Sequence, residues 1–254
     1  MVDAEGGGVA AGDGAAVRER AGGAGARGAP PNNYDGIGPP PARHRSPAPR
    51  RDRARRIARL AHPLVILLAL IPAARLVAGI FLGGLGANPI EEIQHRTGDW
   101  ALNFLVATLA VTPVRRLFGW GWLVTYRRTL GLIAFFYATI HLLNYIVLDL
   151  FFDWGEIGED IMKRPYITIG MAAFIALLPL AVTSTKGWIR RLGGRRWNRL
   201  HQLIYPAAIA GSIHYWMSVK KDIARPLTYV LLFSLLFAVR IGFWYADRRR
   251  RAAG

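Results

Sequence analysis

Three histidines are the residues of this chain whose type and position best suit redox chemistry. His141, His201 and His214 lie in long apolar stretches, and the chain has no cysteine. The absence of cysteine excludes disulfides, iron–sulfur clusters and thiol nucleophiles. Histidine is a common axial ligand of haem iron, and helix bundles often hold such cofactors in their interior. An ionisable side chain inside a bilayer is costly, so its presence there indicates a function.

His141 and His214 are predicted to lie at the same depth in a membrane. His141 follows Arg128 by 13 residues, and His214 follows Leu200 by 14 residues. The helical rise converts these intervals to about 20 Å and about 21 Å from one membrane face. Two imidazoles at matching depth on two helices predict a clamp for one planar metal macrocycle, a b-type haem. Hydrogen-bonded core residues or a proton path are the alternatives.

His201 is predicted to lie near the inner membrane surface, well below this pair. Its partner in depth would be Arg127 or Arg128, and neither suits as a metal ligand. On an ideal helix His201 and His214 point about 140° apart. A stack of two haems with two histidines each is therefore not implied.

The histidines share a depth only if long helices carry them across the bilayer. A hydrocarbon core of about 30 Å needs about 20 helical residues. Six stretches qualify or come close: Pro63–Leu82, Trp100–Val114, Thr129–Phe152, Tyr166–Val182, Leu200–Ser218 and Pro226–Ala246. The predicted fold class is all-α, a polytopic six-helix transmembrane bundle over residues 59–247.

The distribution of charge predicts the orientation of this bundle. The formal net charge is +17, although 52% of the residues are hydrophobic. The segments expected inside carry 22 Lys and Arg, and those expected outside carry six. This bias predicts that both termini are cytoplasmic. We expect anionic lipid, and no nucleic acid, beside the basic segments, because no nucleic-acid-binding motif accompanies them.

Both ends of the chain are predicted to lie outside the membrane domain. Residues 1–58 are rich in Gly, Ala, Pro and Arg, with almost no large apolar side chain. Such a segment cannot bury enough surface to offset the entropy of ordering. We predict a disordered basic cytoplasmic tail there and a short basic cytoplasmic tail over 248–254. A cleavable signal peptide is the alternative for the first segment, but the apolar run begins too late in the chain.

Other features of the sequence narrow the chemistry. No P-loop, dinucleotide fingerprint or HExxH motif occurs, so we expect electron donor and acceptor to be other molecules. Arg75 and Arg240 lie inside predicted spans, and we expect both to snorkel to the membrane surfaces. The alternative for Arg75 is an ion pair with a haem propionate.

Several motifs connect the core to a known family. They are GGLGANPIEEIQHRTGDWAL, RRTLGL, HLLNY, KRPYITIG, TSTKGW and RRWNRLHQLIYPAAIAGSIHYWMSVK. Through them, residues 60–246 resemble the MsrQ (YedZ) family, haem-binding membrane subunits of the bacterial periplasmic protein-methionine-sulfoxide reductase system. That family lies within the wider ferric-reductase-like transmembrane family.

The resemblance implies a set of cofactors and partners. It implies a haem b with His141 and His214 as axial ligands of the iron, and FMN as a further cofactor. His201 corresponds to a further functional histidine, with a second haem or a flavin near it. Electrons would come from the quinone pool or a cytosolic flavin reductase, and would pass to a periplasmic molybdopterin-containing catalytic subunit of MsrP type. The chain would be an electron-transfer subunit in the bacterial inner (cytoplasmic) membrane, without catalytic residues of its own.

Two other functions remain open at this stage. The first is a self-contained membrane ferric or quinone reductase of the b-cytochrome type, which would reduce its substrate at its own surface. The second is a transporter or scaffold without redox activity, which predicts a colourless purified protein.

Overall fold

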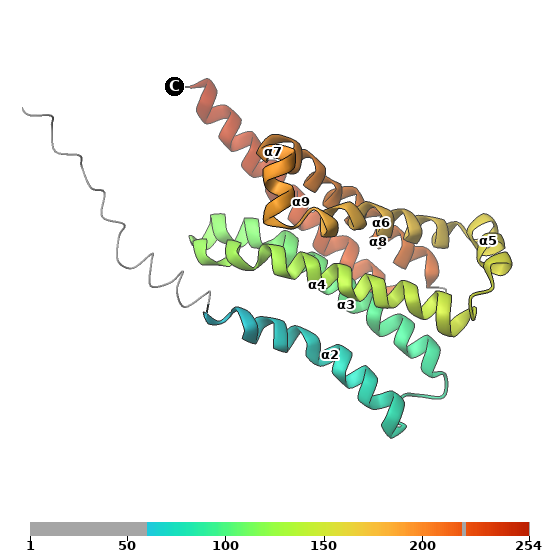
Figure 1. The fold of residues 1–254 in the computed structure, drawn as a ribbon. Helices are drawn as coiled ribbons and strands as arrows, with labels where there is room; N and C mark the ends of the chain where they lie inside the picture. Colours follow the sequence, from blue (N-terminus) through green and yellow to red (C-terminus); the bar gives the residue numbers. More distant parts are fainter. Residues whose placement is uncertain (1–59, 220–221, 254) are drawn as a thin grey trace, which may run out of the picture. The chain divides into compact units, whose positions relative to one another are not determined.

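The computed structural model describes residues 60–219 and 222–253, and within these ranges the chain is helical without any strand (Figure 1). The predicted tail over 1–58 lies outside the described residues. The α-helices are α2 (His62–Leu82), α3 (Pro89–Phe118), α4 (Val124–Leu143), α5 (Trp154–Lys163), α6 (Pro165–Val182), α7 (Lys186–Leu200), α8 (Ile204–Ser218) and α9 (Ala224–Ala252). Shorter segments are the 3₁₀ turns η1 (Gly121–Leu123) and η3 (His201–Leu203) and the π-helix η2 (Asn144–Asp149).

Among the described residues, five helical segments are long and apolar enough to cross a membrane, so the protein is a multi-pass membrane protein. They are His62–Leu82, Pro89–Phe118, Gly121–Asp149, Pro165–Val182 and Ala224–Ala252. The sixth predicted stretch, Leu200–Ser218, contains η3 and α8. With 15 residues, α8 is shorter than the about 20 residues that a full span needs.

The second predicted stretch was too short, because α3 begins 11 residues before Trp100. Asn88 caps the helix, its side chain accepting a hydrogen bond from the backbone N–H of Glu91. Pro89 at the first helical position and acidic residues in the first turn favour a helix start here. His95, which the prediction leaves in a loop, therefore lies on α3.

Two predicted loops contain helices. Asp153 caps α5 by accepting from the N–H of Glu156, and Thr185 caps α7 by accepting from the N–H of Trp188. In the basic α7, Gly193 adopts a φ of 72° and kinks the helix. At the other end of the chain, α9 continues through residues 248–252, which the prediction leaves as a tail.

The core lies between two helix pairs that pack closely, α3 with α4 and α6 with α8, and α9 covers α3 and α8. Leu109 and Ala208 are fully buried at its centre. Arg240 of α9 donates to the carbonyl of Leu109 at 2.6 Å and to the hydroxyl of Tyr205 at 2.8 Å. The expectation that Arg240 snorkels to the surface was wrong, because these acceptors hold the guanidinium between the helices.

Helix α2 is attached through a few polar contacts. The hydroxyl of Tyr137, which is fully buried on α4, donates to the carbonyl of Ala69 at 2.7 Å and accepts from the N–H of Ala73 at 3.2 Å. At the other end of α2, His62 shares a 2.7 Å hydrogen bond with Thr129. The outer face of α2 is a row of exposed Leu, Ile and Phe side chains, as a lipid-facing helix requires.

Candidate functional site

His141 of α4 and His214 of α8 lie opposite each other. Their ring centroids are 6.0 Å apart, and the ring planes are nearly perpendicular at 86°. The structure thus brings together the two histidines that the depth argument pairs. Both lie towards the end of the bundle that carries α5, which we call the α5 end.

Each ring is held by a backbone carbonyl from a different helix. Nδ1 of His141 lies 2.9 Å from the carbonyl oxygen of Gln94 on α3, and Nδ1 of His214 lies 2.7 Å from that of Tyr166 on α6. A carbonyl oxygen only accepts, so each Nδ1 carries the proton and each Nε2 has a free lone pair, which could bind a metal. This arrangement is typical of metal-bound histidines, whose second nitrogen donates to a fixed acceptor.

Two glycines allow these rings to approach the neighbouring helices. A methyl group at Gly170 would lie 2.7 Å from Nδ1 of His214, and one at Gly98 would lie 3.1 Å from Cε1 of His141. Contacts below about 3 Å force one of the two groups to move. The ring of His214 can therefore occupy its position only because residue 170 has no side chain.

The two histidines line one cavity of about 280 Å³ between the helix pairs. Its wall is mostly apolar, and much of it is made of small residues: Gly98, Ala101, Ala134, Ala138, Gly170, Ala173, Ala207 and Gly211. This volume lies just below the about 300–1,000 Å³ that ligand pockets commonly have.

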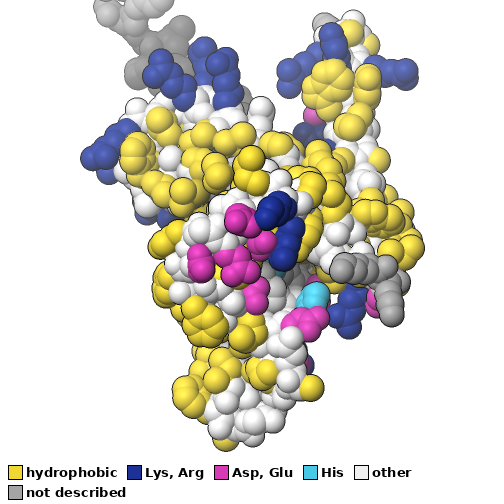
Figure 2. All heavy atoms as spheres, turned by 90° about the vertical axis from the view of Figure 1, so that its right-hand side faces the viewer, with side chains coloured by type: hydrophobic (Ala, Val, Ile, Leu, Met, Phe, Trp, Pro, Cys, Tyr) yellow, Lys and Arg dark blue, Asp and Glu magenta, His cyan; other side chains and the backbone are white. Residues whose placement is uncertain are grey.

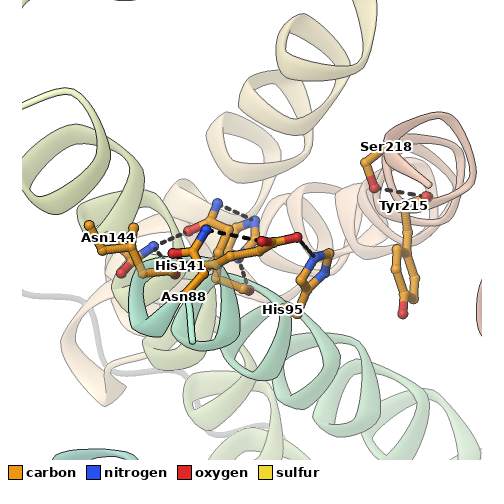
Figure 3. Close-up of polar contacts among 9 residues, drawn as sticks. Asn88, His95, His141, Asn144, Tyr215 and Ser218 are labelled. Carbon is orange, nitrogen blue, oxygen red and sulfur yellow. Dashed lines mark hydrogen bonds and ion pairs between the residues drawn. The ribbon is translucent and has the colours of Figure 1, made fainter. Parts of the chain in front are cut away.

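The side chain of Gln94 lies next to Nε2 of His141. Its Nε2 is 3.3 Å from Nε2 of His141, and its Oε1 accepts a 2.6 Å hydrogen bond from Nδ2 of Asn144. Figure 3 shows His141 and Asn144 beside the first turns of α3, which carry Asn88 and His95. A metal bound to His141 therefore requires the carboxamide of Gln94 to move away, whereas the carbonyl of Gln94 stays in place.

Polar groups gather where the cavity meets the α5 end. Arg164, the residue between α5 and α6, lines the cavity and bonds Asp160 at 3.1 Å through Nη1. The buried carboxylate of Asp160 also accepts a 3.1 Å hydrogen bond from the hydroxyl of Tyr145, and it raises the pKa of the Arg164 guanidinium. Viewed from this end, acidic side chains gather beside a few Lys and Arg (Figure 2).

His201 lies in η3, away from this cavity. Its Nδ1 donates to the carbonyl of Trp197 at 3.2 Å, and the indole of Trp197 stacks on it with centroids 3.8 Å apart. Its Nε2 is buried and has no hydrogen-bond partner among the described residues. The structure keeps His201 apart from His141 and His214. This agrees with the prediction that His201 lies at a different depth from that pair.

Comparison with known proteins defines the class. Residues 97–212 match the family described as "Ferric reductase like transmembrane component". That segment contains His141 and His201, and it ends two residues before His214.

Three relatives are named "Protein-methionine-sulfoxide reductase heme-binding subunit MsrQ". The protein of Rhodospirillum rubrum is 52% identical over 202 residues, covering 80% of this chain and 93% of the relative. That of Herminiimonas arsenicoxydans is 46% identical over 190 residues, covering 74% and 87%. That of Xanthomonas oryzae is 52% identical over 168 residues, covering 66% and 77%. The chain belongs to the MsrQ family.

Sequence reasoning missed several residues of the site. Gln94, Gly98, Arg164 and Gly170 all lie in stretches that carry the family resemblance. Those stretches signalled their importance, but only the fold shows what each residue contacts. Arg75 is exposed on α2 and does not line the cavity that holds His141 and His214.

Proposed function

We propose that this protein is a haem b membrane subunit that passes electrons to a periplasmic molybdopterin protein-methionine-sulfoxide reductase of MsrP type. The donor is quinol or a cytosolic flavin reductase. One observation carries the proposal: two histidines on different helices face each other at 6.0 Å, each with Nδ1 fixed by a carbonyl. The names of the relatives, which describe heme-binding subunits, support the same cofactor.

The spacing of the two rings fits a shared metal. Metal–imidazole bonds of about 2 Å, as in zinc sites, would place the centroids of two ligands roughly 6 Å apart. Among the described residues, no group of three or more His, Asp or Glu could hold a metal ion. A metal whose remaining ligands come from a macrocycle suits a site with two protein ligands, and small Gly and Ala residues line the cavity beside the two rings.

In this proposal the chain binds the haem and orients the two histidine rings. A haem supplies the one-electron change of its iron. The carbonyls of Gln94 and Tyr166 fix the rings of His141 and His214 and raise the basicity of Nε2. The apolar wall excludes water, which together with these hydrogen bonds sets the redox potential.

We propose a second cofactor position near His201, occupied by FMN or a second haem. The buried, unpartnered Nε2 of His201 supports it, because a buried polar atom without a partner calls for an explanation. The basic segments 115–128 and 186–199 offer guanidinium groups for a flavin phosphate.

The proposed setting is the bacterial inner membrane, with six spans and both termini cytoplasmic. The charge bias of 22 against six Lys and Arg supports this orientation. The η3–α8 segment would then be the fifth span, completed by the last turn of α7. The α5 end faces the periplasm in this orientation, so the paired histidines lie close to the side where electrons leave.

A self-contained ferric or quinone reductase is the second candidate, and the match to the ferric-reductase-like family favours it. Reduction of soluble ferric chelates by the purified protein, without a partner protein, would select it. The first candidate predicts fast oxidation of the reduced protein only by the periplasmic subunit.

Both candidate functions require a bound b-type haem. A reduced-minus-oxidised spectrum of the purified full chain, with a pyridine haemochrome count, tests whether it is present. We expect b-type bands with at least one haem per chain. A colourless protein after haem-sufficient expression would contradict both candidates.

A further inference from the structure

The cavity that holds His141 and His214 has an apolar inner end and a polar outer end. Leu102, Leu105, Phe174 and Leu177 line the inner part. At the outer end, towards α5, Arg164 is the one Lys or Arg among the described residues that line the cavity. A ligand with one charged edge can therefore satisfy that edge only at the α5 end.

Arg164 has donors to spare. Its guanidinium bonds Asp160 through one nitrogen and also has a side-chain hydrogen bond with Tyr166, but a guanidinium carries five N–H donors in a planar fork. Its side chain is 52% exposed, so it can turn towards the cavity, whereas Asp160 is 8% exposed and is also bonded by Tyr145. The buried carboxylate of Asp160 thus holds the guanidinium of Arg164 at the cavity mouth.

The other charged groups at the mouth do not compete for this role. Asp99 and Asp149 line the cavity as well, and Asp99 has its own cation in Arg225 at 3.5 Å. His95 lies near Glu91 at 3.6 Å. The neighbouring cation Lys163 bonds Glu159 at 2.5 Å on the exposed side of α5 and does not line the cavity.

We propose that Arg164 binds a propionate carboxylate of the haem, so that the carboxylate edge faces the α5 end and the apolar edge lies among Leu102, Leu105, Phe174 and Leu177. This inference rests on the proposed function, which places a haem b between His141 and His214. A carboxylate turned the other way would be buried without a partner, which is strongly unfavourable. Arginine matches carboxylate geometry, and the charge-assisted bond is about twice as strong as a neutral one.

Haem release from the full-length protein in detergent tests this role without any electron transfer. Haem-loaded protein is mixed with excess apomyoglobin, and the transfer of haem is followed optically. Arg164→Gln is expected to lose haem about ten-fold faster or more. Arg164→Lys should recover part of the loss, and the matched control Lys163→Gln should behave as the parent protein.

The same proteins loaded with the dimethyl ester of haem b, which lacks free carboxylates, separate this contact from a structural effect. Esterification should speed release from the parent protein but should have little further effect in Arg164→Gln. Equal sensitivity to esterification in both proteins would overturn the role of Arg164, even if Arg164→Gln alone loses haem faster.

The result also separates the inference from the proposed function. If the parent protein binds neither haem nor its ester, the proposed function fails and the inference fails with it. If the parent protein binds haem and esterification has no effect on release, only the orientation through Arg164 is wrong.

Discussion

The carbonyl oxygen of Tyr166 lies 2.7 Å from Nδ1 of His214, and this contact joins α6 to α8 at the centre of the site. Gly170, one turn further along α6, lies against the same ring. The position of His214 is therefore determined by two points on a neighbouring helix, a hydrogen bond and a missing side chain.

Gly170→Ala is expected to displace His214, because the new methyl group would lie 2.7 Å from Nδ1. Overpacking of this kind costs about 1–3 kcal/mol, and here it also moves a proposed ligand. We expect lower haem content and an altered visible spectrum in the purified variant. Gly242→Ala is the matched control, because a methyl group there meets no atom within 4 Å. Unchanged haem content in Gly170→Ala would show that His214 does not need this close approach.

Gln94→Ala is expected to speed haem binding to the apoprotein. The carboxamide of Gln94 lies 3.3 Å from Nε2 of His141, and a metal must displace it. Loss of a neutral hydrogen bond of about 0.5–1.5 kcal/mol should raise the association rate by up to about ten-fold. Stopped-flow mixing of apoprotein with haem measures this rate. A slower uptake, with normal thermal stability, would mean that Gln94 assists binding.

The pairing of His141 with His214 was accessible from the sequence because a helix has a fixed rise, so residue spacing converts directly to depth. The hydrogen-bond partners of the two rings could not be predicted from the sequence. Gln94 and Tyr166 act through backbone carbonyls, which carry no signal of residue type. Gly98 and Gly170 are visible in the sequence, but their role depends on which ring faces them in the fold.

The helices, too, could be predicted from the sequence only in part. The apolar stretches predicted five segments that the structure also finds long and apolar enough to cross a membrane, although the start of α3 was missed. Its signal was present, since Asn88 and Pro89 with acidic residues in the next turn are typical of a helix start. The helices α5 and α7 were missed because they are short, polar and outside any apolar run.

Tyr137→Phe is expected to loosen α2. The variant loses the hydrogen bonds to Ala69 and Ala73, which should lower the free energy of unfolding by about 1–3 kcal/mol, because the partners are left unsatisfied. Thermal unfolding in detergent measures this effect, and haem content should stay the same. Tyr245→Phe, at an exposed position, is the control. Equal stability of the two variants would contradict the role of Tyr137 as the attachment of α2.

We expect His201→Ala to spare the proposed haem between His141 and His214 but to slow electron entry. His201 lies outside their cavity, so these two histidines and their carbonyl partners are untouched. The rate of haem reduction by a quinol or by a reduced flavin should fall, while the haem-to-protein ratio stays that of the parent. An unchanged rate with both donors would remove His201 from the electron path.

The most direct test of the central claim is the haem content of His141→Ala and His214→Ala, measured on membrane-inserted protein. Both variants should lose the proposed b-type haem, because each removes one of the two proposed ligands of its iron, while His62→Ala should keep it. His62 is a suitable control because it bonds Thr129 and does not line the cavity. Full haem content with an unchanged spectrum in either His141→Ala or His214→Ala would contradict the account.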